Sequence, residues 1–191
     1  MQRINVVGVS GSGKSTFAKQ LAYTLNFPYI EMDALYWRPH WQEASTQEFL
    51  QQITSALKRD RWVLDGNYHS KTVAHKWQRA DTVIWLNYGF CRTLWQVCWR
   101  CVQRAWTKQE LWPGTGNKES FYRSFFTRDS VIWWMLTNYH HNQTRYEQAI
   151  HSPQFTHLHF YRLTNPKQSQ EFLLSLSRQQ SSIANDQFQC P

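Results

Sequence analysis

Residues 8–16 have the composition of a loop that binds phosphate groups. The segment reads GVSGSGKS from Gly8 to Ser15, and Thr16 follows it. Glycines let the backbone wrap closely around phosphate oxygens, and successive N–H groups can point at those oxygens beside a helix N-terminus. The lysine of such a loop contacts the β- and γ-phosphates, and the hydroxyl after it binds Mg²⁺. We therefore predict Mg²⁺ and ATP as cofactors, with ATP bound by Gly8, Ser10, Gly11, Ser12, Gly13, Lys14, Ser15 and Thr16.

Two aspartates stand where predicted strands end. Asp65 closes an apolar stretch that begins at Trp62, and Asp33 follows the short stretch from Tyr29. In an open parallel sheet, ligands bind outside the carboxyl ends of the strands. We predict that Asp65 holds Mg²⁺ together with Ser15, and that Asp33 accepts a proton from an acceptor hydroxyl. The alternatives are a turn-forming Asp-Gly pair at Asp65 and a helix or loop cap at Asp33.

A stripe of polar side chains follows one face of a predicted helix that begins at Phe90. Its members, four residues apart, are Arg92, Gln96, Arg100 and Arg104. The helix leads into a Pro- and Gly-rich loop, which we interpret as a lid over about residues 107–120. Arginines beside a closing lid can stabilise charge on a transferred phosphoryl group, so we predict catalytic roles for Lys14, Asp33, Arg100 and Arg104. A merely solvated stripe is the alternative.

Strand and helix patterns alternate along the chain, which predicts a parallel sheet with helices on both faces. The predicted strands cover residues 3–8, 28–32, 61–65, 82–86 and 157–163. The predicted helices cover residues 14–26, 46–59, 70–79, 90–106, 121–150 and 167–178.

Length and composition favour one globular domain. The chain has 191 residues, of which 41% are hydrophobic, and a formal net charge of +8. We predict a single domain over residues 1–178 and a polar tail without regular structure over residues 179–191. The longest apolar run, at residues 131–136, is too short to cross a bilayer, so we expect no membrane partner. The positive charge suits an anionic ligand, and it gives no indication of oligomeric state.

Cysteines and tryptophans complete the composition. Cys91, Cys98 and Cys101 fall in one predicted helix rather than across loops, which favours a cytoplasmic protein with buried thiols. No second cysteine pair accompanies the CxxC of Cys98 and Cys101, so we expect no structural metal. Many of the eleven tryptophans lie near arginines in residues 92–134. These aromatic side chains could stack on nucleic-acid bases, but their helical spacing favours a core position.

Three segments in this order resemble one family. They are Gly8–Thr16, then DALYWRPHW from Asp33 to Trp41, then DGNY from Asp65 to Tyr68. Together they are similar to the P-loop kinase family related to adenylate kinase and often labelled DNA topology modulation protein. The resemblance extends from residue 3 to about residue 175 and includes the arginine helix, Glu119, Trp133, Trp134, Arg162 and Leu163.

The resemblance implies an α/β P-loop NTPase of the nucleoside-monophosphate-kinase type. Such a fold has three layers (α/β/α), a five-stranded parallel sheet in the order 2-3-1-4-5 and a helical lid. By the same likeness, Thr164 and Asn165 would lie near the adenine. Asp33, Arg38 and Asn67 would face the acceptor, and Arg100 and Arg104 the phosphates.

The expected activity is Mg²⁺-dependent transfer of the γ-phosphoryl group of ATP to a small acceptor. The chain lacks the glycine-rich acceptor signatures of adenylate kinases, which leaves a nucleotide, a nucleoside or a hydroxylated metabolite as the acceptor. A GTPase is disfavoured because the sequence NKES at Asn117–Ser120 lacks the aspartate of a guanine-reading motif. A nucleotide-sensing regulator that binds nucleic acid through residues 91–134 is the remaining alternative.

Overall fold

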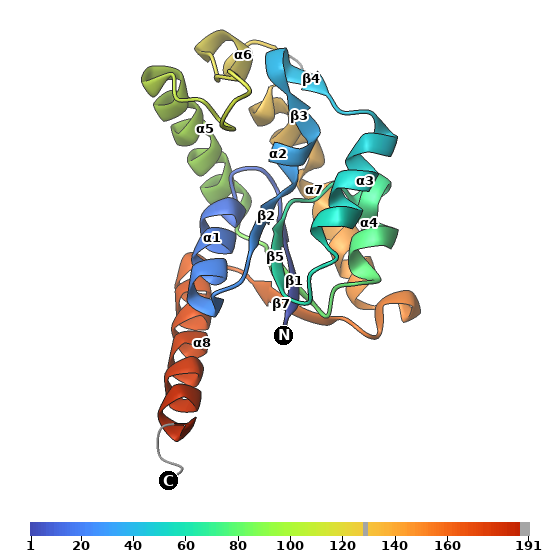
Figure 1. Ribbon diagram of the computed structural model, residues 1–191. Coiled ribbons are helices and arrows are strands. Elements are labelled where there is room, and N and C mark those ends of the chain that lie inside the picture. Colours follow the sequence, from blue (N-terminus) through green and yellow to red (C-terminus); the bar gives the residue numbers. More distant parts are fainter. Residues whose placement is uncertain (128–129, 188–191) are drawn as a thin grey trace.

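A parallel β-sheet forms the centre of the computed structural model, which describes residues 1–127 and 130–187 (Figure 1). The strand order is β2-β5-β1-β6-β7, and each neighbouring pair is parallel. Counted along the chain within this sheet, the order is 2-3-1-4-5, so the predicted fold class is confirmed. The strands are β1 (Arg3–Gly8), β2 (Tyr29–Glu31), β5 (Trp62–Asp65), β6 (Thr82–Leu86) and β7 (His159–Leu163).

Six longer helices and several short elements connect the strands. The longer helices are α1 (Lys14–Leu25), α3 (Thr46–Ala56), α4 (His69–Trp77), α5 (Phe90–Thr107), α7 (Val131–Ile150) and α8 (Pro166–Gln187). The short elements are α2 (Met32–Tyr36), β3 (Trp37–Arg38), η1 (Pro39–Trp41), β4 (Gln42–Glu43), α6 (Phe121–Phe125) and η2 (Pro153–Phe155).

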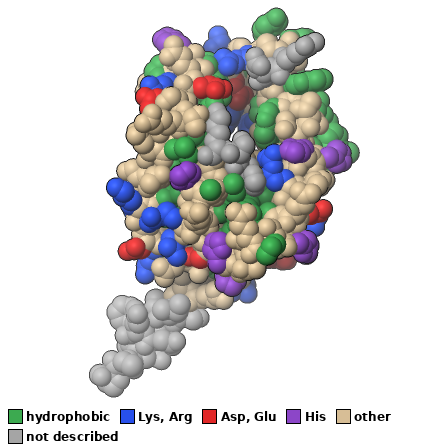
Figure 2. All heavy atoms as spheres, turned by 90° about the vertical axis from the view of Figure 1, so that its right-hand side faces the viewer, with side chains coloured by type: hydrophobic (Ala, Val, Ile, Leu, Met, Phe, Trp, Pro, Cys, Tyr) green, Lys and Arg blue, Asp and Glu red, His purple; other side chains and the backbone are tan. Residues whose placement is uncertain are grey.

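The two faces of the sheet are covered by different helices because successive strand residues point to opposite sides. Val63, Ile84 and their neighbours on one face pack against α1 and α8. Leu64 and Trp85 on the other face pack with buried residues of α3, α4 and α7. Figure 1 shows α1 and α8 to the left of the sheet and α3 and α4 to its right. On the α3–α4 face, basic side chains are interspersed with acidic and histidine side chains (Figure 2).

The segment after β2 is more structured than the sequence indicated. It forms α2, and then β3 and β4 pair antiparallel, with Trp37 opposite Glu43 and Arg38 opposite Gln42. His40 and Trp41 adopt left-handed backbone angles, each with φ of 59°, at the turn between them. We refer to residues 37–43 as the hairpin. It lies at the same end of the molecule as the predicted lid (Figure 1), and the rings of Trp37 and Trp41 contact that of Trp112 in the lid segment.

Two sequence predictions about helix extent were wrong. The predicted helix over residues 121–150 is two helices, and α7 begins after Ser130, whose hydroxyl accepts a hydrogen bond from the Trp133 N–H. Such a cap marks a helix start that apolar periodicity alone does not reveal. The predicted tail without regular structure is helical as far as Gln187, because α8 continues well beyond residue 178. The end of that tail, residues 188–191, lies outside the described residues.

The prediction that the tryptophans of residues 92–134 lie mainly in the core was also wrong. Trp95, Trp99 and Trp106 are 70%, 54% and 88% exposed. The inner face of α5 is instead formed by Thr93, Val97 and Cys101, so tryptophans elsewhere around the helix point outward. Burial raises the pKa of the Cys101 thiol to about 11, and this thiol is therefore protonated at neutral pH.

Among the helices within residues 1–127 and 130–187, none has the length and apolar character that crossing a membrane requires.

Candidate active site

The phosphate-binding loop is held in shape from two sides. At its far end, Gly13 has a φ of 83°, a left-handed conformation that favours glycine, and α1 begins immediately after it. In its middle, Gly11 lies against α5 so closely that a Cβ atom there would come within 2.7 Å of the Thr93 carbonyl oxygen. The N–H groups at the start of α1 are therefore directed toward the loop, as anion binding requires.

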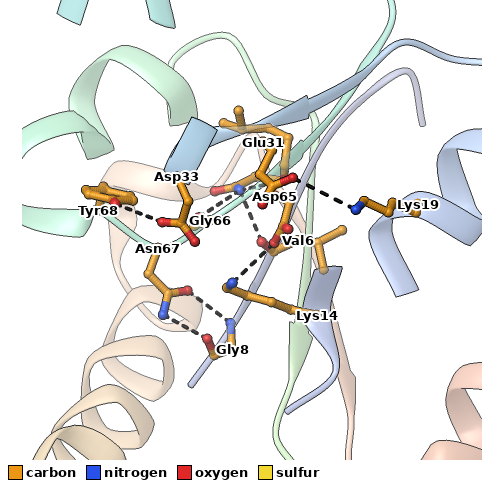
Figure 3. Close-up of polar contacts among 12 residues, drawn as sticks. Val6, Gly8, Lys14, Lys19, Glu31, Asp33, Asp65, Gly66, Asn67 and Tyr68 are labelled. Atoms are coloured by element: carbon orange, nitrogen blue, oxygen red, sulfur yellow. Dashed lines mark hydrogen bonds and ion pairs between the residues drawn. The ribbon is translucent and has the colours of Figure 1, made fainter. Parts of the chain in front are cut away.

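Asn67 supports the start of the same loop. Its Oδ1 accepts a hydrogen bond from the Gly8 N–H at 3.0 Å, and its Nδ2 donates to the Gly8 carbonyl at 2.8 Å (Figure 3). The Tyr146 hydroxyl also donates to Oδ1, at 3.1 Å. Both acceptor positions of Oδ1 are thus occupied. The Asn67 side chain thus braces the phosphate-binding loop, and its predicted contact with the acceptor stays a prediction.

Lys14 and Asp65 form the charged pair at the centre of the site. Lys14 Nζ lies 3.4 Å from Asp65 Oδ1, and the Asp65 side chain is 1% exposed. Burial alone would lower the pKa of Lys14, but the carboxylates of Asp65 and Asp33 outweigh it, so the pKa lies above its usual value. Lys14 is therefore positively charged where the sequence predicts phosphate groups.

Asp33 lies beside this pair, at the start of α2. Its Oδ1 accepts a hydrogen bond of 2.8 Å from the Tyr68 hydroxyl (Figure 3). Burial and the neighbouring Asp33 raise the pKa of Tyr68 far above its usual value, so Tyr68 keeps the proton that it donates. The contact fixes the orientation of the Asp33 carboxylate, and Asp33 affects the pKa of both Lys14 and Arg100.

The two predicted catalytic arginines differ in their partners. Arg104 Nη1 lies 2.9 Å from Glu119 Oε1, at the end of the lid segment. Arg100 is more deeply placed, and burial, followed by the charge of Arg104, lowers its pKa, whereas Glu119 and Asp33 oppose that shift. Arg100 is therefore the arginine of this helix that lies within electrostatic reach of both Asp33 and Lys14. Arg92, the first residue of the stripe, is exposed.

Several buried polar atoms of the described residues have no hydrogen-bond partner, and most of them lie in this region. They are Ser12 Oγ, Asp65 Oδ1, Gln96 Oε1, Arg100 Nε and Glu119 Oε2. Buried polar atoms are normally paired, so unpaired ones indicate a ligand that supplies the missing bonds. The Asp65 carboxylate, whose Oδ1 forms an ion pair with Lys14 but no hydrogen bond, and the Ser15 hydroxyl at the start of α1 are oxygen ligands that suit Mg²⁺.

Other predicted site residues have structural partners of their own. Arg38 Nη2 lies 2.8 Å from Glu48 Oε1 on α3, which directs the guanidinium toward that helix. The Thr164 N–H and hydroxyl both donate to Gln168 Oε1, and Asn165 Oδ1 accepts from the Gln168 N–H. These last contacts cap the start of α8. The predicted roles of Arg38 at the acceptor and of Thr164 and Asn165 at the adenine stay predictions.

Sequence reasoning missed three residues that contact the site. The Tyr29 hydroxyl lies 2.9 Å from Asp65 Oδ2 and 3.3 Å from Glu31 Oε2. The indole N–H of Trp112, in the lid segment, donates to Glu31 Oε1 at 3.1 Å. The two-residue period of β2 places Tyr29 and Glu31 on one side of that strand. The contact with Trp112 spans 81 residues of sequence and has no local signal.

A buried lysine lies beneath the turn that follows β5. Lys76, on α4, is 0% exposed, and its ammonium group donates to the carbonyl oxygens of Gly66 and Asn67. Burial, followed by the charges of Arg145 and Lys14, lowers the pKa of Lys76 to about 7. Its protonation should therefore differ between the folded and unfolded chain at mildly alkaline pH.

This difference predicts a pH dependence of stability. Between about pH 7 and 10 the unfolded chain binds a proton at Lys76 that the folded chain does not, so the free energy of unfolding should rise with pH. The contribution of Lys76 to the free energy of unfolding should increase by up to about 1.4 kcal/mol per pH unit. Lys76→Met should remove it, and urea unfolding across this pH window measures the difference in slope. Parallel slopes for the two proteins would contradict the prediction.

Comparison with known proteins supports a kinase-type fold. Residues 4–65 match the ATPase family associated with various cellular activities (AAA). Cytidylate kinase of Chlamydia trachomatis is 44% identical over 54 residues, which is 25% of this chain and 25% of that protein. The cytidylate kinase of Chlamydia muridarum is 43% identical over the same length. The match thus spans about a quarter of these relatives.

Solved structures resemble almost the whole chain. Shikimate kinase of Acinetobacter baumannii, in complex with shikimate, aligns with a TM-score of 0.57 and 17% identity, over 97% of this chain and 94% of that one. A gluconokinase of Sinorhizobium meliloti aligns with a TM-score of 0.52 and 18% identity, over 97% of each chain. The protein therefore has the fold of the P-loop kinases, with a phosphate-binding loop in the position that this fold gives it.

Proposed function

We propose that the protein is a Mg²⁺-dependent kinase that transfers the γ-phosphoryl group of ATP to a hydroxyl group of a small molecule. The observation that carries the proposal is the arrangement of the Lys14–Asp65 pair, 3.4 Å apart, with the Asp33 carboxylate beside it. Lys14 binds the donor phosphates, Asp65 binds Mg²⁺, and Asp33 accepts the proton of the acceptor hydroxyl. Phosphoryl transfer depends mainly on such positioning and on stabilisation of charge.

The donor side is formed by the phosphate-binding loop. Its N–H groups and Lys14 bind the phosphate oxygens, while Ser15 and Asp65 hold Mg²⁺. A Mg²⁺ ion held by these two residues would supply positive charge that neutralises part of the phosphate charge. Arg100 stabilises the charge that develops on the transferred group, and Arg104, paired with Glu119, lies next to it along α5.

Asp33 favours a hydroxyl acceptor over a phosphate acceptor. A hydroxyl must lose a proton as it attacks phosphorus, and a carboxylate held by Tyr68 can accept that proton. A phosphate monoester is already largely ionised at neutral pH, so it needs no base and would be repelled by Asp33. A carboxylate base at this position disfavours an adenylate-kinase-like specificity.

Asp33→Asn should lower the rate of transfer about a hundredfold or more while ATP binding stays unchanged, because the amide cannot accept the hydroxyl proton. The test is incubation with Mg²⁺ and γ-labelled ATP against nucleosides, nucleoside monophosphates and hydroxylated acids. Cytidylate, shikimate and gluconate belong in this panel because the compared kinases are named for them. Label on one hydroxyl acceptor, lost in the variant, would support the proposal.

Label transferred only to a phosphate group, at an equal rate in Asp33→Asn, would refute the assignment of Asp33. ATP binding with no labelled acceptor and only slow hydrolysis would refute the kinase. That result would favour the alternative function, a nucleotide-sensing regulator, which the comparisons do not support.

A further inference from the structure

A chain of polar contacts connects the lid segment to the centre of the site. The Trp112 indole N–H donates to Glu31 Oε1 at 3.1 Å, and Glu31 Oε2 lies 3.3 Å from the Tyr29 hydroxyl. That hydroxyl lies 2.9 Å from Asp65 Oδ2, and Asp65 Oδ1 lies 3.4 Å from Lys14 Nζ. This series of contacts thus connects the lid, through Glu31 and Tyr29 of β2, to Asp65, the predicted metal ligand.

In this series of contacts, the Tyr29 hydroxyl is the group whose proton can take two orientations. A phenol has one proton, and here two carboxylates, those of Glu31 and Asp65, lie within reach of it. A tyrosine hydroxyl, whose ordinary pKa is about 10, keeps this proton at neutral pH. Rotation about the C–O bond therefore decides which carboxylate receives the hydrogen bond.

The docked lid favours one of these arrangements. While Trp112 donates to Glu31, that carboxylate has a donor of its own. The Tyr29 hydroxyl then lies closer to Asp65 Oδ2, at 2.9 Å, than to Glu31 Oε2, at 3.3 Å. Without Trp112, the partners of the partly buried Glu31 carboxylate include Lys19, 4.0 Å from Oε2, and the closer Tyr29 hydroxyl at 3.3 Å, so the Tyr29 proton would be drawn toward Glu31. Undocking the lid would then weaken the hydrogen bond that orients Asp65.

The lid is fixed in the docked position by a second contact. The Asn117 side chain accepts from the Trp41 N–H at 2.9 Å and donates to the Arg38 carbonyl at 2.8 Å, which ties the lid to the hairpin. The Trp112 ring also faces that of Trp37, with centroids 6.5 Å apart and planes 17° from parallel. Trp112 is 8% exposed as a result.

We propose that Trp112, Glu31 and Tyr29 are positioning residues that couple docking of the lid to the orientation of Asp65 for metal-bound nucleotide. The inference rests on the proposed Mg²⁺–ATP site. Coupling is reciprocal, so binding of Mg²⁺ and ATP should in turn stabilise the docked lid.

The test is a double-mutant cycle on nucleotide affinity, measured by calorimetry with and without Mg²⁺. Trp112→Phe keeps an aromatic ring beside Trp37 but removes the N–H donor, and Tyr29→Phe removes the shared proton. Each variant should reduce the gain in ATP affinity that Mg²⁺ provides about fivefold, the net value of one typical hydrogen bond. The double variant should show about the same fivefold loss, because both changes break one path.

A second readout concerns the lid itself. Mg²⁺ and ATP should slow hydrogen exchange of the backbone amides in residues 108–120 of the wild type, and much less in Tyr29→Phe, although Tyr29 lies outside the lid. Trp106→Phe is the matched control, since Trp106 is 88% exposed, and it should behave like the wild type in both measurements.

The outcomes separate the two proposals. If Mg²⁺ gives the wild type no gain in ATP affinity, the proposed function fails. If it gives that gain and Trp112→Phe shows the same gain, or the two single losses multiply to about 25-fold in the double variant, only the coupling is refuted.

Discussion

Lys14→Met is expected to lower the rate of phosphoryl transfer about a thousandfold, because it removes the ammonium group placed against the predicted γ-phosphate. Lys14 is charged in the folded protein, since the carboxylates of Asp65 and Asp33 outweigh the effect of burial on its pKa. Methionine keeps most of the apolar stem, so the loss measures the charge. Transfer of label from γ-labelled ATP under saturating Mg²⁺ gives the rate.

The control for this variant is Lys167→Met. Lys167 lies on α8 with its side chain 85% exposed, and it forms only a surface ion pair with Glu171. Its replacement should leave transfer unchanged. A Lys14→Met protein that folds normally and retains at least a tenth of wild-type activity would refute the catalytic role of the phosphate-binding loop.

Trp77→Ala is expected to lower the free energy of unfolding by about 3–5 kcal/mol, the usual cost of emptying the site of a large aromatic side chain. Trp77 is 0% exposed, and its ring packs edge-on against Phe155 and Phe160. Its indole N–H donates to Asn5 Oδ1 at 2.9 Å, within the sheet core. Urea unfolding followed by circular dichroism measures the change.

Trp106→Ala is the matched control for the core variant, because Trp106 is 88% exposed. Its stability should change by no more than about 0.5 kcal/mol. Trp77→Phe should be intermediate, since it keeps an aromatic ring but leaves Asn5 Oδ1 without its donor. Equal stabilities for Trp77→Ala and Trp106→Ala would show that the α4 face of the core does not hold the sheet together.

The fold was predictable from sequence where one physical signal dominates. The strands of the main sheet are short apolar runs, and their alternation with helices fixes parallel pairing and right-handed crossovers. The elements that were missed depend on contacts between distant residues. The hairpin at residues 37–43 is held to the lid by Asn117, and no pattern within either segment indicates that pairing.

In the candidate site, too, sequence patterns indicated some residues, whereas the roles of others depend on contacts between distant parts of the chain. Residue types, together with positions at strand ends, made Lys14 and the two aspartates site candidates, and the structure brings Lys14 and Asp65 to 3.4 Å. The bracing role of Asn67 was missed because an amide suits an acceptor as well as a backbone brace, and only the geometry shows that it binds Gly8. The tryptophans of α5 were misplaced because helical spacing groups side chains on a face without saying whether that face points inward.

The bracing of Gly8 by Asn67 has a consequence for how the nucleotide arrives. A loop already fixed at Gly8, Gly11 and Gly13 loses little conformational entropy when phosphate enters it. Association with ATP should therefore proceed as a fast, single-phase encounter, without a slow isomerisation of the loop. Any slow phase after mixing then reports on undocking of the lid from the hairpin and from Glu31.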